Sequence, residues 1–301
     1  MENNCVLVKV SPEVSLKTRF VRKYFTDKLI ASIKGVFRAN GVSGTKIVRG
    51  NGRLFIFPEK KQNLQKIHSV LGFVFGVHSR SLSACLDFKE SGELIRNGVN
   101  YAEKFFGEGT FKVDARRESF SEMTSQQMNE KLGSAILVAM PKLKVKLSDP
   151  KNTLFVEVVK NNAFFYVNEK NGPGGLPLGC EGNVAVFFEG KKNELAAAFL
   201  VMKRGCNVFP VVKKDSEKIR THVNKLVPWN SFRLFKFSPI EDIEGLAVKK
   251  DISVKAIVFS NDSYSKQLSE QKQGFSIAVY WPLLFAPKGM VKETMVMIDG
   301  G

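Results

Sequence analysis

The chain has 301 residues, 44% of them hydrophobic, and a formal net charge of +17 at pH 7. The apolar share is enough to build buried cores and excludes a chain that is disordered over long stretches. No apolar run is long enough to span a bilayer, and the first residues do not resemble a secretory signal, so we expect a cytoplasmic protein without a membrane partner. Residues 1–75 hold 14 lysines and arginines against four acidic residues. This excess predicts a polyanionic partner, with a charge that only serves solubility as the alternative.

The first 78 residues alternate between strand-like and helix-like apolar spacing. Strands are predicted at 4–10, 45–50, 53–57 and 73–78, and helices at 16–38 and 63–71. The order β-α-β-β-α-β is typical of a ferredoxin-like unit. One face of the first helix is apolar, and basic side chains follow another face.

The next ninety residues continue with mixed elements. Helices are predicted at 90–106 and from Thr124 onward, and strands at 111–115, 153–159 and 163–167. Thr124 with Gln127 fits a capping box at the start of the second helix. The residues Lys160-Asn161-Asn162 predict a hairpin between the last two strands.

A run with five glycines and two prolines at 171–182 marks the clearest boundary in the chain. Beyond it, strands are predicted at 184–188, 207–212, 232–237 and 253–259, and helices at 191–204 and 215–226. This alternation is typical of a parallel sheet covered by helices.

The strand at 184–188 leads directly into the helix at 191–204. Such a turn is where nucleotide phosphates bind, because free backbone N–H groups and the helix dipole favour an anion. The turn here lacks the glycine pair and the serine and aspartate chemistry of such a site. Its residues are Glu189, Gly190, Lys191, Lys192, Asn193 and Glu194.

Several segments, taken in order, resemble the tRNA 4-thiouridine synthetase (ThiI-type) family. They lie at 8–13, 16–18, 22–25, 113–117, 124–126, 147–150, 156–158, 172–179 and 200–206. The resemblance implies a combined α/β and α+β fold. Its domains would be a ferredoxin-like domain at 1–72, a THUMP RNA-binding domain at 73–170, the Gly/Pro linker at 171–182, and a Rossmann-like, parallel-sheet PP-loop ATP pyrophosphatase-type domain at 183–301.

Departures from the family pattern concern its chemistry. The family turn reads Ser-Gly-Gly-x-Asp-Ser where this chain has 189–194, and a lysine at position 191 would block close approach of a pyrophosphate. The nucleotide-contacting turn that resembles 256–263 has no glycine here, and no cysteine follows Cys206 to carry sulfur. We therefore predict no catalytic residue, no cofactor and a degenerate nucleotide loop. The alternative is an active ATP-dependent tRNA sulfurtransferase with a divergent nucleotide site using Lys191 and Lys192.

No metal site is predicted, because the four cysteines lie far apart without a Cys-x-x-Cys pair and the three histidines do not cluster with them. The predicted partner is tRNA, and the chain would act as an RNA-binding or adaptor protein in tRNA modification. A separate tRNA-modifying enzyme is a further candidate partner, and a homodimer is left open. A purely protein-binding role with incidental basicity is the third reading. The residues predicted to bind RNA are Lys17, Arg19, Arg22, Lys23, Lys112, Arg116, Arg117, Lys142, Lys144 and Lys146.

Overall fold

The computed structural model describes residues 2–118, 122–263 and 274–300. The chain divides into two compact units. Unit 1 comprises Met1–Lys9, Val42–Ser69 and Ser79–Asn171, and unit 2 comprises Val10–Gly41, Val70–His78 and Gly172–Gly301. No described helix combines the length and the hydropathy needed to cross a membrane. The predicted domain boundaries at 72, 170 and 182 stay predictions.

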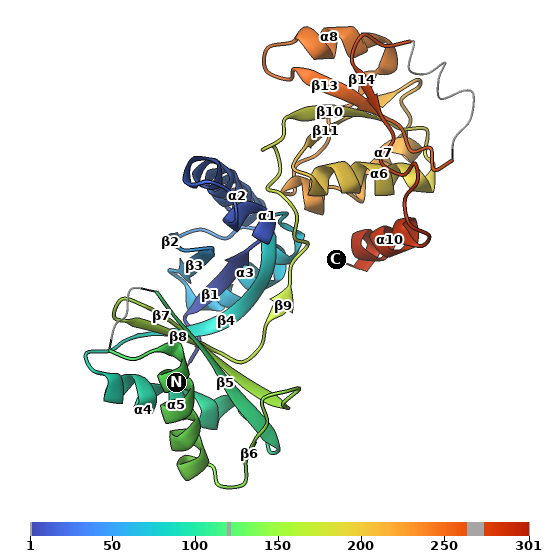
Figure 1. Cartoon of the computed structure of the whole chain (residues 1–301). Coiled ribbons are helices and arrows are strands. Elements are labelled where there is room, and N and C mark those ends of the chain that lie inside the picture. The colour runs from blue at the N-terminus through green and yellow to red at the C-terminus, as the bar shows by residue number, and fades with distance from the viewer. Residues whose placement is uncertain (1, 119–121, 264–273, 301) are drawn as a thin grey trace. The chain divides into compact units, whose positions relative to one another are not determined.

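The first elements follow the ferredoxin-like order, as the spacing predicted (Figure 1). They are β1 (Cys5–Val10), the short α1 (Pro12–Ser15), α2 (Arg19–Ala39), β2 (Thr45–Gly50), β3 (Arg53–Pro58), α3 (Leu64–Val70) and β4 (Val77–Asp87). The strands are hydrogen-bonded in the order β2-β3-β1-β4, so the first strand lies inside the sheet. The predicted fourth strand at 73–78 is displaced: a 3₁₀ turn occupies Leu71–Phe73 and the strand begins at Val77.

The next elements extend the same sheet in the order β4-β8-β7-β5-β6, and β9 pairs with β4. They are α4 (Ser91–Phe105), β5 (Thr110–Glu118), α5 (Ser125–Ala139), β6 (Lys144–Val145), β7 (Asn152–Val159), β8 (Asn162–Tyr166) and β9 (Lys170–Asn171). The capping box is confirmed, since the Thr124 hydroxyl accepts from the Gln127 N–H and the Gln127 side chain accepts from the Thr124 N–H. The predicted hairpin is confirmed as the antiparallel pair β7–β8.

Helices α4 and α5 bury their apolar sides against one face of β5, β7 and β8. Leu94, Tyr101, Leu132 and Ile136 of the helices join Val156 of the sheet in one buried cluster. This packing fixes the alternation of β5, so Phe111, Val113 and Ala115 point into the cluster and are buried. Burial of a phenylalanine or valine side chain contributes about 1.5–3 kcal/mol, and this burial holds β5 in register.

The C-terminal part is a five-stranded sheet in the order β12-β11-β10-β13-β14, with parallel pairing throughout. Its elements are β10 (Asn183–Phe187), α6 (Lys192–Lys203), β11 (Asn207–Val212), α7 (Glu217–Asn224), β12 (Ser238–Pro239), α8 (Ile243–Val248), β13 (Val254–Val258), β14 (Ala278–Tyr280) and α10 (Met290–Gly300). Helices α6, α7 and α10 pack in one core, while α8 packs against the other sheet face (Figure 1). The predicted parallel sheet covered by helices is confirmed.

The strand predicted at 232–237 is wrong. Ser231 and Phe232 have φ of +53° and +58°, which turns the backbone out of the extended region and ends any strand there. Phe235 is buried in the core, whereas Leu234 is exposed. The apolar residues that suggested a strand therefore belong to an irregular segment, and Phe235 reaches the core from it. From this stretch, Ser238–Pro239 pairs with β11.

Candidate nucleic-acid interface and nucleotide turn

Three arginines gather in unit 1 where β5 and β7 approach their ends. Arg116 and Arg117 lie near the end of β5, and Arg53 opens β3. With Asn51 they line an open hollow of about 180 Å³ whose rim also includes Glu118. We call Arg53, Arg116 and Arg117 the arginine cluster.

Arg53 is the anchored member of the cluster. Its Nε lies 2.8 and 3.0 Å from the two carboxylate oxygens of Glu157, which is buried. The Tyr166 hydroxyl donates to the same carboxylate at 3.0 Å. Burial and this carboxylate raise the pKa of the Tyr166 phenol, so the hydroxyl stays protonated and keeps donating. The counter-charge of Arg53 is therefore internal to the fold.

Arg116 and Arg117, predicted to bind RNA, are exposed at the surface of the cluster. The side chain of Arg116 is 61% exposed, and its Nε lies 3.8 Å from a carboxylate oxygen of Asp114, a long contact that stabilises little. Successive strand residues point to opposite faces, yet both arginines contribute to the lining of the same hollow. Guanidinium groups suit phosphate and base stacking alike.

The other predicted residues of unit 1 are placed less tightly. Lys112 is half-buried two residues into β5. Lys142, Lys144 and Lys146 are all exposed around the two-residue edge strand β6. Lys142 lies 3.8 Å from Glu108 across an exposed contact. The structure thus brings Arg116 and Arg117 together with Arg53, and leaves these lysines on a solvated edge.

The predicted residues near the N-terminus lie in unit 2, at the start of α2. Lys17 and Arg19 are exposed, and so is Lys23. Arg22 is half-buried, and its guanidinium donates to the Ser15 carbonyl at 3.3 Å, so it holds the preceding turn. A single positive surface that joins these residues to the arginine cluster stays a prediction.

The turn between β10 and α6, residues 189–194, contains an anion site that is already filled. The carboxylate of Glu194 accepts hydrogen bonds from three consecutive backbone N–H groups, those of Glu189, Gly190 and Lys191, each at 2.9 Å. Gly190 has φ of +95°, which a side chain would strain, and this conformation aims the three donors at one point. Glu194 is 2% exposed. The N–H groups of Glu189, Gly190 and Lys191 thus form a nest that could hold a phosphate, and the chain's own carboxylate fills it.

Other contacts secure the same turn. The Lys191 ammonium donates to the Glu189 carboxylate at 2.6 Å, which raises the pKa of the lysine. The His222 ring nitrogen Nε2 lies 3.0 Å from the Lys191 carbonyl, which accepts from it. Lys191 itself is extended, with φ of −86° and ψ of 145°. The lysine therefore carries no backbone strain, because Gly190 adopts the unusual conformation instead.

An open hollow of about 560 Å³ lies beside the turn, at the carboxyl ends of β10 and β13. The sheet order places β11 on one side of β10 and β13 on the other, which makes this crevice a topological switch point, where open α/β sheets bind ligands. Phe187, Phe259, Ser260 and Asn261 line it with the turn. No glycine is present among Ser260, Asn261 and Asp262, and the Asn193 amide donates to the Asp262 carboxylate at 3.1 Å.

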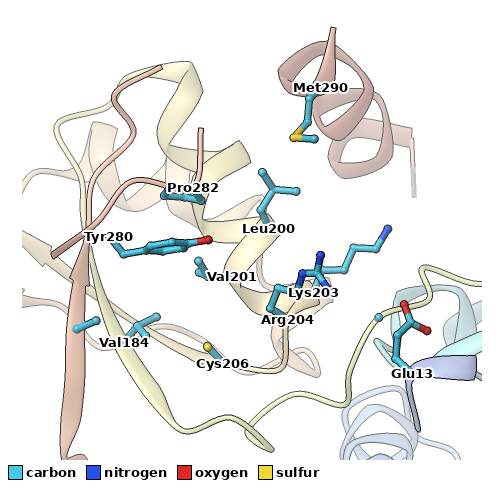
Figure 2. Close-up of a pocket in the computed structure, with 12 residues that line it drawn as sticks. Glu13, Val184, Leu200, Val201, Lys203, Arg204, Cys206, Tyr280, Pro282 and Met290 are labelled. Atoms are coloured by element: carbon cyan, nitrogen blue, oxygen red, sulfur yellow. The ribbon is translucent and has the colours of Figure 1, made fainter. Parts of the chain in front are cut away.

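Figure 2 shows a different cavity, of about 450 Å³, along the C-terminal half of α6. Leu200, Val201 and Met290 give it an apolar wall, and Lys203 and Arg204 also line it. Its lining shares no described residue with the turn, which lies at the opposite end of α6.

Sequence reasoning missed two functional features. Arg53 and Glu157 are 104 residues apart, so no local pattern links them. The sequence did contain a signal for the placement of the Glu194 side chain. A glutamate at the third helical position accepts the N–H of the residue that caps the helix, which is Lys191 here. Glu194 was predicted only as part of a degenerate nucleotide loop, whereas its carboxylate binds the turn.

Family models match two parts of the chain: the ThiI ferredoxin-like domain at residues 5–81 and the THUMP domain at residues 94–168. A probable tRNA sulfurtransferase of Methanobrevibacter smithii is 34% identical over 213 residues, covering 68% of this chain and 53% of that protein. Another, of Methanothermobacter thermautotrophicus, is 29% identical over 246 residues, covering 75% and 60%. The chain thus spans about half the length of the curated relatives it matches.

Solved structures show the same fold. A protein of Pyrococcus horikoshii Ot3 superposes with a TM-score of 0.84 at 24% identity, covering 99% of this chain and 100% of that one. A 4-thiouridine synthetase, solved in complex with RNA and ATP, superposes with a TM-score of 0.74 at 19% identity, covering 100% and 87%. This likeness covers the ferredoxin-like strands, the THUMP strands and the parallel sheet together. The chain is a relative of the tRNA 4-thiouridine synthetases, built from a ThiI-type ferredoxin-like domain, a THUMP domain and a parallel α/β sheet.

Proposed function

We propose that this chain binds tRNA and serves tRNA modification as a non-catalytic RNA-binding or adaptor protein. The relatives are named tRNA sulfurtransferases, and a synthetase of the same fold was solved with RNA, which supports RNA as the partner. The arginine cluster supplies cationic, forked donors suited to phosphate. A phosphate-dominated interface makes the affinity fall steeply with salt.

The non-catalytic part of the proposal depends on one observation, the Glu194 carboxylate seated on the three N–H groups of the turn. A nucleotide phosphate would have to displace this buried carboxylate or lie against it. Two like charges about 4 Å apart repel by about 4 kcal/mol at surface-like dielectric. The degenerate loop is thus closed to ATP by the chain itself.

The cysteines support the same reading. Burial raises the pKa of Cys85 and of Cys180 to about 12, and it raises the pKa of Cys5 and Cys206 as well. A thiolate is the species that carries sulfur, so at neutral pH these four thiols are poor carriers. A sulfur transfer would therefore need a thiolate other than those of these four cysteines.

One observation favours the alternative, an active ATP-dependent tRNA sulfurtransferase with a divergent site. The hollow of about 560 Å³ beside the turn is of nucleotide size and lies at the switch point of the sheet. Lys192 lines it and is exposed. In this reading ATP would bind with its phosphates away from the filled nest.

Calorimetric titration with Mg-ATP, paired with gel retention of a tRNA transcript, tests the proposal. We expect retention of tRNA and no heat of ATP binding. A matched gain-of-function variant rebuilds the family turn by Glu189→Ser, Lys191→Gly, Asn193→Asp and Glu194→Ser, and we expect it to bind ATP. Micromolar ATP binding by the native chain, or 4-thiouridine in tRNA after incubation with ATP and a sulfide donor, would establish the alternative.

A further inference from the structure

Two aromatic side chains stand out of the surface at the start of α2. Phe20 is 83% exposed and Tyr24 is 44% exposed. They are four residues apart, so they lie on the same side of the helix one turn from each other. Leu16, just before the helix, is also exposed. Single exposed apolar residues need no explanation, but neighbouring ones on one face mark a binding surface.

The surroundings of this aromatic pair are cationic. Lys17, Arg19 and Lys23 are exposed beside it, and the Lys28 ammonium lies 5.6 Å from the centre of the Tyr24 ring. The first turn of α2 holds no acidic residue. The surface therefore offers flat apolar faces inside a positive frame.

Charge decides which partner this surface suits. A second copy of the chain meeting it across a two-fold axis would set these cations against their own copies, which costs free energy. Unpaired nucleotides carry both complementary parts, since each base has a flat face and each phosphate a negative charge. Residues four apart rise about 6 Å along a helix axis, so each of the two side chains can offer its face to a base of its own.

We infer that Phe20 and Tyr24 form a stacking platform for unpaired nucleotides of the bound RNA, with Lys17, Arg19 and Lys23 holding the flanking phosphates. This rests on the proposed function, because it assigns a role in RNA binding to one surface of α2. It gives the basic start of α2 a preference for single-stranded over duplex RNA. The arginine cluster in unit 1 serves as a separate phosphate contact.

The test removes the aromatic faces and keeps the apolar character and the charge. We expect the double variant Phe20→Leu with Tyr24→Leu to bind a ten-nucleotide oligoadenylate about tenfold more weakly than the native chain. Its affinity for inorganic polyphosphate of the same charge should not change. Phe285→Leu, which alters another exposed phenylalanine, is the matched control and should leave both affinities unchanged.

A spectroscopic readout separates stacking from attraction of charges. In Phe20→Trp, the added indole fluorescence should be quenched by oligoadenylate and unaffected by polyphosphate. Unchanged oligoadenylate affinity in the double leucine variant, or an equal loss on both polyanions, would overturn the platform. A native dimer that Phe20→Ala dissociates would also overturn it, in favour of self-association. Retention of tRNA by the native chain, measured in parallel, tells failure of the platform from failure of the proposed function.

Discussion

The arginine cluster and the β10–α6 turn are both built to meet anions, but they differ in where the anion comes from. In the cluster, the buried Glu157 pairs with Arg53, and the side chain of Arg116 stays mostly exposed. In the turn, all three converging N–H groups are occupied by Glu194. The first region leaves guanidinium charge exposed, which the proposed function assigns to an external phosphate, and the second uses its hydrogen-bond donors within the fold. The same physical chemistry thus leaves exposed positive charge in one place and stabilises a turn in the other.

The largest expected effect comes from removing the internal counter-charge of the cluster. Glu157→Ala leaves the Arg53 guanidinium without its partner in a largely buried position, and it also removes the acceptor of the Tyr166 hydroxyl. We expect a loss of about 3 kcal/mol in the free energy of unfolding, measured by urea denaturation.

The matched control is Glu118→Ala, in the same hollow. Glu118 is half-buried, and its carboxylate accepts the Asn51 N–H at 3.1 Å. Its removal should cost about 1 kcal/mol or less. Equal losses in the two variants would mean that Glu157 is not the specific anchor of Arg53, and the contrast between the two regions would weaken.

The second prediction concerns the exposed members of the cluster. Arg116→Ala with Arg117→Ala should weaken tRNA binding about tenfold to a hundredfold at low salt, because each of the two lost phosphate contacts contributes about 0.7–1.4 kcal/mol. The slope of log affinity against log salt should become shallower by about two. Stability should change little, since both side chains are exposed.

Lys249→Ala with Lys250→Ala removes the same charge from an exposed segment of unit 2 and serves as the control. If the two double variants lose affinity equally, net charge alone explains binding. If neither loses affinity, the cluster is not part of the interface. Both measurements are filter-binding or gel-retention titrations across a salt series.

Local patterns predicted the parts of the fold that local interactions decide. The capping box at Thr124 and the hairpin at Lys160-Asn161-Asn162 are signals within a few residues, and both are confirmed. The strand at 232–237 failed because its apolar residues fill a core from an irregular segment with positive φ at Ser231 and Phe232. Periodicity alone does not distinguish these two ways of burying apolar surface.

Local patterns were limited in the same way for the candidate sites, because these depend on contacts between residues far apart in the sequence. Arg116 and Arg117 were predictable as neighbours in sequence, whereas Arg53 is linked to this hollow through its side-chain contact with Glu157, 104 residues away. The aromatic pair of α2 escaped prediction because most phenylalanines in the chain follow core periodicity, and exposure depends on what the rest of the chain covers. The filled nest depends on the rotamer of Glu194, which composition does not reveal.

The smallest expected effect is the pH dependence of the stability that Glu194 contributes, which reports how strongly the turn prefers an anion. Burial raises the pKa of the Glu194 carboxyl above its usual 4.5, although three backbone N–H groups and His222 act in the opposite direction. A carboxyl whose pKa is higher in the folded state binds protons more tightly when folded. Its contribution to stability is therefore greatest at low pH, and it declines as pH rises from 4.5 through the raised pKa.

The measurement compares the native chain with Glu194→Gln, which cannot titrate at this position. Other carboxyl groups contribute equally to both proteins, so the difference between their unfolding free energies isolates Glu194. We expect this difference to fall as pH rises above 4.5 and then to level off. A difference that instead grows with pH would mean that the three N–H groups outweigh burial. The nest would then strongly favour a full negative charge, and a phosphate could compete for it once Glu194 is removed.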